Sequence, residues 1–214
     1  MSLLDMETLV ATPLCDDPYD YVIVRNFVRP EAAGAIGADY PKVGKAGSFA
    51  LSDVTVKGAF GELIGELNGP AFRKAVEAKF GISLSGRATT FTVRGMCGPD
   101  DGNIHTDSKT KIITVLLYLN PDWAPDGGRL RVLRNGHDLD AVAAETPPDF
   151  GTLLMFRRAD NSWHGHKPFL GERRVVQMNW VTSDRVAAWQ MFRHRVSAAV
   201  KRLAPAAGVA KAEA

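Results

Sequence analysis

The sequence predicts a mainly β domain with flanking α-helices, in which a helical N-terminal part precedes an all-β core. Apolar residues recur at helical spacing before residue 88, whereas short apolar and β-branched runs separated by Gly and Pro follow residue 89. With 214 residues and 45% hydrophobic content, the chain is long enough for one well-packed domain. We therefore expect the β part to form a sandwich or a small barrel.

The N-terminal part is expected to open with a strand and to continue as helices. Residues 21–24, Tyr-Val-Ile-Val, are typical of a strand, and the alanine-rich stretch over roughly 31–38 predicts a helix. Glycines and polar residues predict a loop over 41–56. Two helices separated by Gly69-Pro70 should follow, because these apolar residues fall at helical spacing: Phe60, Leu63, Ile64, Leu67, Phe72, Val76 and Phe80.

The β core is expected over about 89–184. Its candidate strands are 89–94, 112–119, 129–133, 152–156 and 174–181. After the core, apolar residues at helical spacing predict an amphipathic helix over 186–203, followed by small residues. The sequence thus predicts one domain over 1–184, helical to about residue 88, and a C-terminal helix with an Ala-rich tail over 185–214.

Composition and charge argue against several classes of partner. Lys and Arg total 26 against 24 for Asp and Glu, and they are scattered, so we expect no nucleic-acid partner. No signal-like leader and no run of about 18 apolar residues occurs, so we expect a cytoplasmic protein without a membrane partner. The two cysteines, Cys15 and Cys97, lack the spacing of a disulfide framework.

A candidate metal site begins with His105-Thr106-Asp107, shortly before the apolar run 112–119. Side chains two residues apart on an extended segment point the same way, so the imidazole and the carboxylate can face one ion. A third ligand could come from the histidines of 161–166, just after the candidate strand 152–156. Two imidazoles and one carboxylate leave metal positions open, which suits catalytic non-haem Fe(II).

The last candidate strand implies an acidic cosubstrate. Arg173 and Arg174 stand where this strand begins, directly before Val175 and Val176. A guanidinium on a core strand is costly to bury unless an anion meets it. A guanidinium also matches a carboxylate with two parallel hydrogen bonds.

The ordered set of motifs resembles the Fe(II)/2-oxoglutarate-dependent dioxygenases, and within them the prolyl-4-hydroxylase-like branch. The resemblance runs from about Thr89 to Val181. It rests on His105-Thr106-Asp107, 114–123, Gly127-Gly128-Arg129-Leu130, 162–166 and Gly171-Glu172-Arg173. It implies a double-stranded β-helix, the jelly-roll or cupin-like fold, with the N-terminal helices packed on one sheet.

The resemblance also implies the metal ligands. His105, Asp107 and His164 would bind Fe(II), because Ser162-x-His164-Gly165 has the form of the family motif. His166 lies two residues further on and is the alternative to His164.

The cosubstrate residues follow in the same way. An arginine of the 173/174 pair would bind the distal carboxylate of 2-oxoglutarate, although neither is followed by the Ser or Thr that the family usually has two residues later. We favour Arg173, while the opposite register would place Arg174 inside, since a one-residue slip exchanges the faces of a strand. Tyr118 matches a tyrosine that touches the same cosubstrate, and Thr114 would share its face.

The implied activity is that of an oxygenase that uses Fe(II), 2-oxoglutarate and O2. It would hydroxylate an unactivated C–H bond of a protein side chain or a small molecule, with release of succinate and CO2, and its oligomeric state is open. Two alternatives remain, since fold alone does not decide function. One is a non-catalytic, cupin-like sensor module that binds metal or a small acid, and the other is a metal-dependent isomerase.

Overall fold

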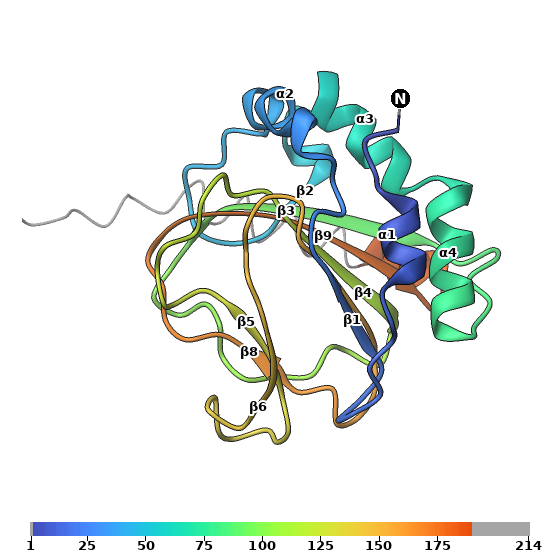
Figure 1. Cartoon of the computed structure of the whole chain (residues 1–214), viewed down its shortest axis with the longest axis vertical. Helices are drawn as coiled ribbons and strands as arrows, with labels where there is room; N and C mark the ends of the chain where they lie inside the picture. The colour runs from blue at the N-terminus through green and yellow to red at the C-terminus, as the bar shows by residue number, and fades with distance from the viewer. Residues whose placement is uncertain (1, 190–214) are drawn as a thin grey trace, which may run out of the picture.

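A six-stranded sheet forms the centre of the domain, with the helices on one side and a three-stranded sheet on the other (Figure 1). The structure is a computed structural model and describes residues 2–189. The large sheet has the strand order β1-β7-β4-β9-β3-β2, and the small sheet has the order β6-β5-β8. All their pairings are antiparallel. The predicted fold class is confirmed.

The strands follow the chain in the order of their labels. They are β1 (Tyr21–Val24), β2 (Phe49–Ala50), β3 (Thr89–Cys97), β4 (Lys111–Tyr118), β5 (Leu130–Leu133), β6 (Val142–Thr146), β7 (Leu153–Arg157), β8 (His164–Gly165) and β9 (Gly171–Val181). The helices are α1 (Met6–Ala11), α2 (Ala33–Asp39), α3 (Gly58–Leu67) and α4 (Pro70–Phe80), with short 3-10 segments at Pro30–Ala32 and Leu51–Asp53.

Helix α4 begins and ends at residues that favour a helix start and a helix end. Pro70 occupies the first turn, where its missing N–H costs no hydrogen bond. Gly81 ends the helix in the left-handed conformation, with φ of 61°. Between these ends Phe72, Val76 and Phe80 recur every four residues and are buried, so α4 presents one apolar stripe to the sheet.

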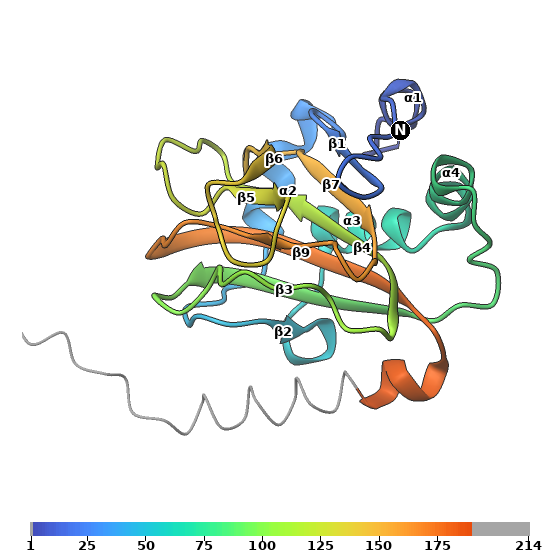
Figure 2. The same ribbon diagram turned by 90° about the horizontal axis from the view of Figure 1, so that it is seen from below.

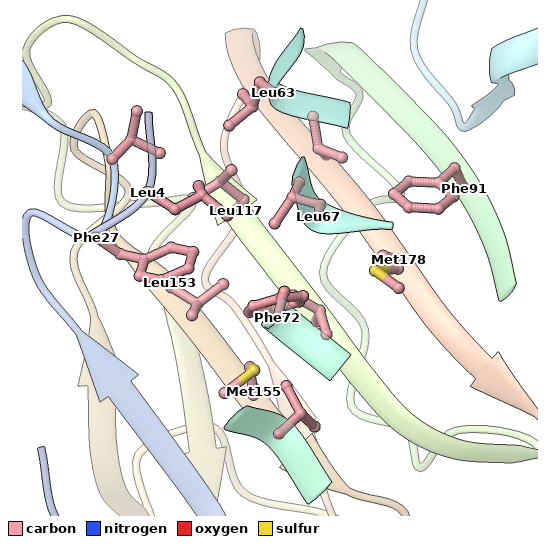
Figure 3. Close-up of a cluster of buried hydrophobic side chains, with 14 of the residues drawn as sticks. Leu4, Phe27, Leu63, Leu67, Phe72, Phe91, Leu117, Leu153, Met155 and Met178 are labelled. Atoms are coloured by element: carbon pink, nitrogen blue, oxygen red, sulfur yellow. The ribbon is translucent and has the colours of Figure 1, made fainter. Parts of the chain in front are cut away.

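The main hydrophobic core lies between the helices and the large sheet (Figure 3). Alternate residues of the sheet strands point into this core, because successive side chains of a strand face opposite sides. Among them are Val115 and Leu117 of β4, with Val176 and Met178 paired opposite on β9. This packing fixes the sheet whose other face carries the candidate site.

The opposite face of the large sheet is partly polar and looks toward the small sheet. Strands β4, β9 and β3 lie side by side (Figure 2). Thr114 of β4 pairs with Asn179 of β9, which pairs with Thr90 of β3, so the three polar side chains share this interior face. A second apolar cluster lies on the same side: Tyr19, Tyr21, Tyr118, Leu130, Val132, Leu154, Phe156 and Val175.

The largest stability loss in the core is expected for Phe72→Ala. The Phe72 side chain is fully buried, and its ring centroid lies 5.7 Å from that of Phe27 and 6.0 Å from that of Trp180. Removing the ring should lower the free energy of unfolding by about 3–5 kcal/mol. Urea denaturation measures this loss, and Val10→Ala, at a position 67% exposed, is the control that should change little.

Several short elements, β8 among them, differ from the sequence prediction. Helix α1 lies in the N-terminal leader, where Asp5 caps it by accepting a 3.0 Å hydrogen bond from the Thr8 amide. Strand β2 lies within the predicted loop over 41–56, and β6 forms from Val-Ala-Ala-Glu-Thr, a sequence with little β-propensity whose first four residues are not buried. Pairing with β5 accounts for β6.

The predicted C-terminal helix is only partly within the described residues. Residues 184–189 are helical, and the remainder of the predicted helix and the Ala-rich tail lie outside the described part. Among the residues that the structure describes, no helix combines the length and the apolar character needed to span a bilayer.

Candidate metal centre

His105, Asp107 and His164 come together between the two sheets. One ligand atom from each, two imidazole nitrogens and a carboxylate oxygen, lie within 4.8 Å of one another. His164 belongs to β8, which pairs with β5, and its main chain forms an antiparallel bridge with His105. The two hydrogen bonds of this bridge are each 3.0 Å long. The bridge therefore holds both imidazoles next to each other, with ring centroids 4.3 Å apart.

Main-chain carbonyl groups select the same tautomer for both histidines. Nδ1 of His105 lies 2.9 Å from the Asn103 carbonyl oxygen, and Nδ1 of His164 lies 2.9 Å from that of Ser162. A carbonyl oxygen only accepts, so each Nδ1 carries the proton and donates it. The Nε2 lone pair of each ring is thus free to bind a metal.

Asp107 is buried and held as an anion by its neighbours. Lys111 Nζ donates to Asp107 Oδ1 at 2.6 Å, and the Thr114 hydroxyl donates to Oδ2. Burial opposes the charge of Asp107, but Lys111, His164 and the Thr114 hydrogen bond together hold the pKa of Asp107 below its usual value. A carboxylate in this state is ready to bind a cation.

Polar side chains of the large sheet surround Thr114, whose hydroxyl donates to Asp107. Thr114 Oγ1 lies 3.1 Å from Asn179 Oδ1, and Asn179 Nδ2 donates to Thr90 Oγ1 at 3.2 Å. Gln177 Nε2 also donates to Asn179 Oδ1, at 3.3 Å. Thr114 thus contacts the predicted metal ligand and also lines the cavity. Its contact with the cosubstrate stays a prediction.

Arg173 and Tyr118 line the same cavity as the three ligands. Arg173 is 5% exposed and Tyr118 is fully buried. Arg173 Nε donates to the Gly128 carbonyl at 2.8 Å, and Arg173 Nη2 to the Tyr118 hydroxyl at 3.4 Å. Within residues 2–189, no carboxylate lies within ion-pair distance of Arg173. This buried cation therefore calls for an anionic ligand.

Burial also keeps Tyr118 protonated, because it raises the pKa of the phenol in spite of the Arg173 charge. The Tyr118 oxygen accepts from Arg173, so its own proton remains available for donation to the same anion. Together, the guanidinium and the phenol form a site suited to a carboxylate.

Arg174 and His166, the alternatives for the two roles, make other contacts. Arg174 projects from the other face of β9, pairs with Glu172 and lies over the Tyr40 ring. His166 lines the cavity near Arg173, but it is outside the group of metal-ligating atoms. His166 Nδ1 faces the Lys167 carbonyl at 2.9 Å instead.

The two buried histidines predict a pH dependence of the metal-free protein. Desolvation lowers the pKa of both His164 and His166 from 6.5 to about 4. Between these values the unfolded chain binds protons that the folded chain does not. Stability should therefore be full above pH 6.5, decline toward pH 4 and then level off for these groups.

Urea midpoints measured across this pH range in the presence of a chelator check the expectation. His166→Asn should flatten the slope, whereas the same change at the exposed His137 should not. A slope that is equal in wild type and His166→Asn would contradict the assignment.

Two residues that contact Asp107 were not predicted from the sequence. Lys111 contacts its carboxylate, and Arg158 Nε donates to its main-chain carbonyl at 3.2 Å. The Lys111 contact depends on an irregularity of β4, and the Arg158 contact joins segments far apart in sequence. No local pattern in the sequence signals either one.

Comparison with known proteins agrees with the geometry. The model of the family described as 2OG-Fe(II) oxygenase superfamily matches residues 93–182, which include all three metal-ligating residues and Arg173. A search of curated proteins found no match.

Solved structures with a similar fold include prolyl 4-hydroxylases. The Phytophthora capsici enzyme matches with a TM-score of 0.60 and 20% identity, over 92% of this chain and 76% of its own. The Pseudomonas putida prolyl-4-hydroxylase has a TM-score of 0.52 and 19% identity, over 82% and 90%. The viral collagen prolyl hydroxylase of Paramecium Bursaria Chlorella virus-1 has a TM-score of 0.52 and 15% identity, over 78% and 99%.

Proposed function

This chain belongs to the 2OG-Fe(II) oxygenase superfamily, and we propose that it hydroxylates a side chain of a peptide, with proline as the first candidate. The family and the triad of His105, Asp107 and His164 imply Fe(II) and 2-oxoglutarate as cofactors. The observation that carries the proposal is the placement of these three ligands in one cavity with Arg173, a buried cation with no acidic partner among the described residues.

The donor set fits the cofactors on chemical grounds. Two neutral imidazoles and one carboxylate suit Fe(II) and leave positions for other ligands. Arg173 and Tyr118 would hold the distal carboxylate of 2-oxoglutarate, since both can donate to it. The Gly128 carbonyl orients Arg173 for this task.

The protein residues position the reactants and exclude water. When bound, Fe(II) with 2-oxoglutarate and O2 supplies the oxidant for an unactivated C–H bond. His105, Asp107 and His164 would hold the metal, and the Thr114 hydroxyl keeps the carboxylate in place by donating to it. The apolar side chains of Leu116, Leu130 and Val175 line the cavity and limit its water content.

The size and exposure of the cavity favour a peptide substrate. Its volume is about 100 Å³, whereas pockets that enclose drug-sized ligands measure roughly 300–1,000 Å³. The cavity is therefore too small to enclose a drug-sized substrate, and the substrate should lie at the mouth beside His105, which is exposed. A peptide can leave its main chain outside and present one side chain there. The prolyl hydroxylase names of the similar structures support proline as that side chain.

Turnover with matched peptides tests the proposal. The full chain is incubated with Fe(II), 2-oxoglutarate and either proline-containing peptides or the same peptides with alanine in place of proline. We expect succinate and a mass increase of one oxygen atom with the proline peptides alone. His164→Ala should remove both products, and His137→Ala, at an exposed position, should retain them.

The opposite outcome is equally specific. Succinate formation stimulated by free amino acids or other small molecules, with no oxygen added to any peptide, would overturn the peptide proposal and leave the oxygenase in place.

A further inference from the structure

Lys111 places a positive charge beside a metal ligand. Its Nζ lies 2.6 Å from Asp107 Oδ1, and its side chain is 15% exposed. A cation in this position competes with a metal for the same carboxylate, so its presence needs a reason. Among residues 2–189, Asp107 is the only acid within ion-pair distance of Lys111.

The fold turns Lys111 toward the site by a β-bulge. Lys111 pairs with Val181 and Ile113 with Trp180, so β4 has one residue more than β9 at this point. In a regular strand Lys111 would share the face of Ile113, which is fully buried in the core under the helices. The extra residue re-aims Lys111 to the interior face, as bulges beside active sites do.

Each oxygen atom of Asp107 accepts a hydrogen bond from a different side chain. Lys111 donates to Oδ1, the Thr114 hydroxyl donates to Oδ2, and Arg158 donates to the main-chain carbonyl. A carboxylate has about four lone-pair sites. One oxygen can therefore bind a metal while each oxygen keeps its protein donor. Binding by both oxygens would place the metal on Oδ1 beside the Lys111 ammonium, and the two positive charges would repel each other.

We propose that Lys111 is a positioning residue that restricts Asp107 to one metal–oxygen bond and so keeps a neighbouring metal position open for 2-oxoglutarate. The two donors then have different tasks. Thr114 is neutral and orients the carboxylate toward the metal, which favours metal binding. Lys111 is cationic and restricts the carboxylate to one metal–oxygen bond, which favours binding of the cosubstrate. The proposal rests on the metal and cosubstrate site above and does not depend on which substrate is hydroxylated.

The test separates metal binding from cosubstrate binding. The metal-free full chain is titrated with Co(II), whose visible spectrum reports its coordination, and the Co(II) form is then titrated with 2-oxoglutarate. The variants are Lys111→Met, Lys111→Arg and Thr114→Val. The matched control is Lys109→Met, at an exposed position two residues before β4.

The variants should differ in which affinity they change. Lys111→Met should bind Co(II) at least as tightly as wild type, show an altered Co(II) spectrum and bind 2-oxoglutarate roughly 10-fold more weakly or worse. Lys111→Arg should restore 2-oxoglutarate binding, because it keeps the charge. Thr114→Val should weaken Co(II) binding by about 10–100-fold, and Lys109→Met should behave as wild type.

Several results would overturn the proposal. A loss of Co(II) affinity in Lys111→Met would make Lys111 a supporting residue of the metal. A 2-oxoglutarate affinity within about two-fold of wild type would remove its role toward the cosubstrate. Failure of the wild type itself to bind Co(II) would overturn the metal centre, and that outcome is distinct because it appears before any variant is compared.

Discussion

Asp107→Asn should abolish catalysis by removing the anionic ligand of the metal centre. The change keeps the shape of the side chain but removes its charge, which offsets the positive charge of the metal and of Lys111. We expect Fe(II) affinity to fall by more than about 100-fold, since even residues that merely support a metal ligand contribute 10–100-fold. Isothermal titration with metal under anaerobic conditions, together with succinate formation, measures both effects.

A matched control separates this effect from a general change in charge. Asp126→Asn alters an exposed aspartate outside the cavity and should leave metal affinity and turnover unchanged. If Asp107→Asn retained wild-type metal affinity, the metal would have to lie elsewhere, and the assignment of Asp107 would be wrong.

Arg173→Met should weaken 2-oxoglutarate binding while leaving metal affinity intact. Methionine fills much of the buried volume but offers no donor to the distal carboxylate, and truncating one partner of a buried charge pair costs roughly 2–5 kcal/mol. This loss corresponds to a rise of tens- to thousands-fold in the KM for 2-oxoglutarate. Steady-state kinetics against 2-oxoglutarate concentration measures it.

Arg174→Met is the control at the adjacent position. Its guanidinium pairs with Glu172 and lies over Tyr40, outside the cavity, so its KM should stay near that of wild type. A larger KM change for Arg174→Met than for Arg173→Met would exchange the two assignments.

The elements that could be predicted from the sequence are those that form because of residues within the element itself, such as apolar side chains at regular spacing and Gly or Pro at the ends. Helices α3 and α4 combine apolar residues at helical spacing with Gly69-Pro70 between them. Strand β9 carries Val175, Val176, Met178, Trp180 and Val181 among its polar residues. In contrast, β6 and β8 are strands because β5 lies between them, and pairing of this kind depends on distant segments.

The same division applies to the site. His105 and Asp107 could be paired in advance because side chains alternate along an extended segment. The choice between His164 and His166 was open, because it depends on the main-chain bridge to His105. Lys111 was missed for a related reason: alternation places it with Ile113 in the core, and the bulge that reverses this placement is a property of the β4–β9 pairing.

The central claim is that Fe(II) and 2-oxoglutarate bind together in the cavity formed by the triad and Arg173. Anaerobic addition of 2-oxoglutarate to the Fe(II)-loaded protein, followed by visible absorption, tests it directly. We expect the charge-transfer band of an Fe(II)–2-oxoglutarate chelate in wild type, its loss in Asp107→Asn, and a much higher half-saturating concentration in Arg173→Met. Bound Fe(II) with no band at any 2-oxoglutarate concentration would contradict the claim.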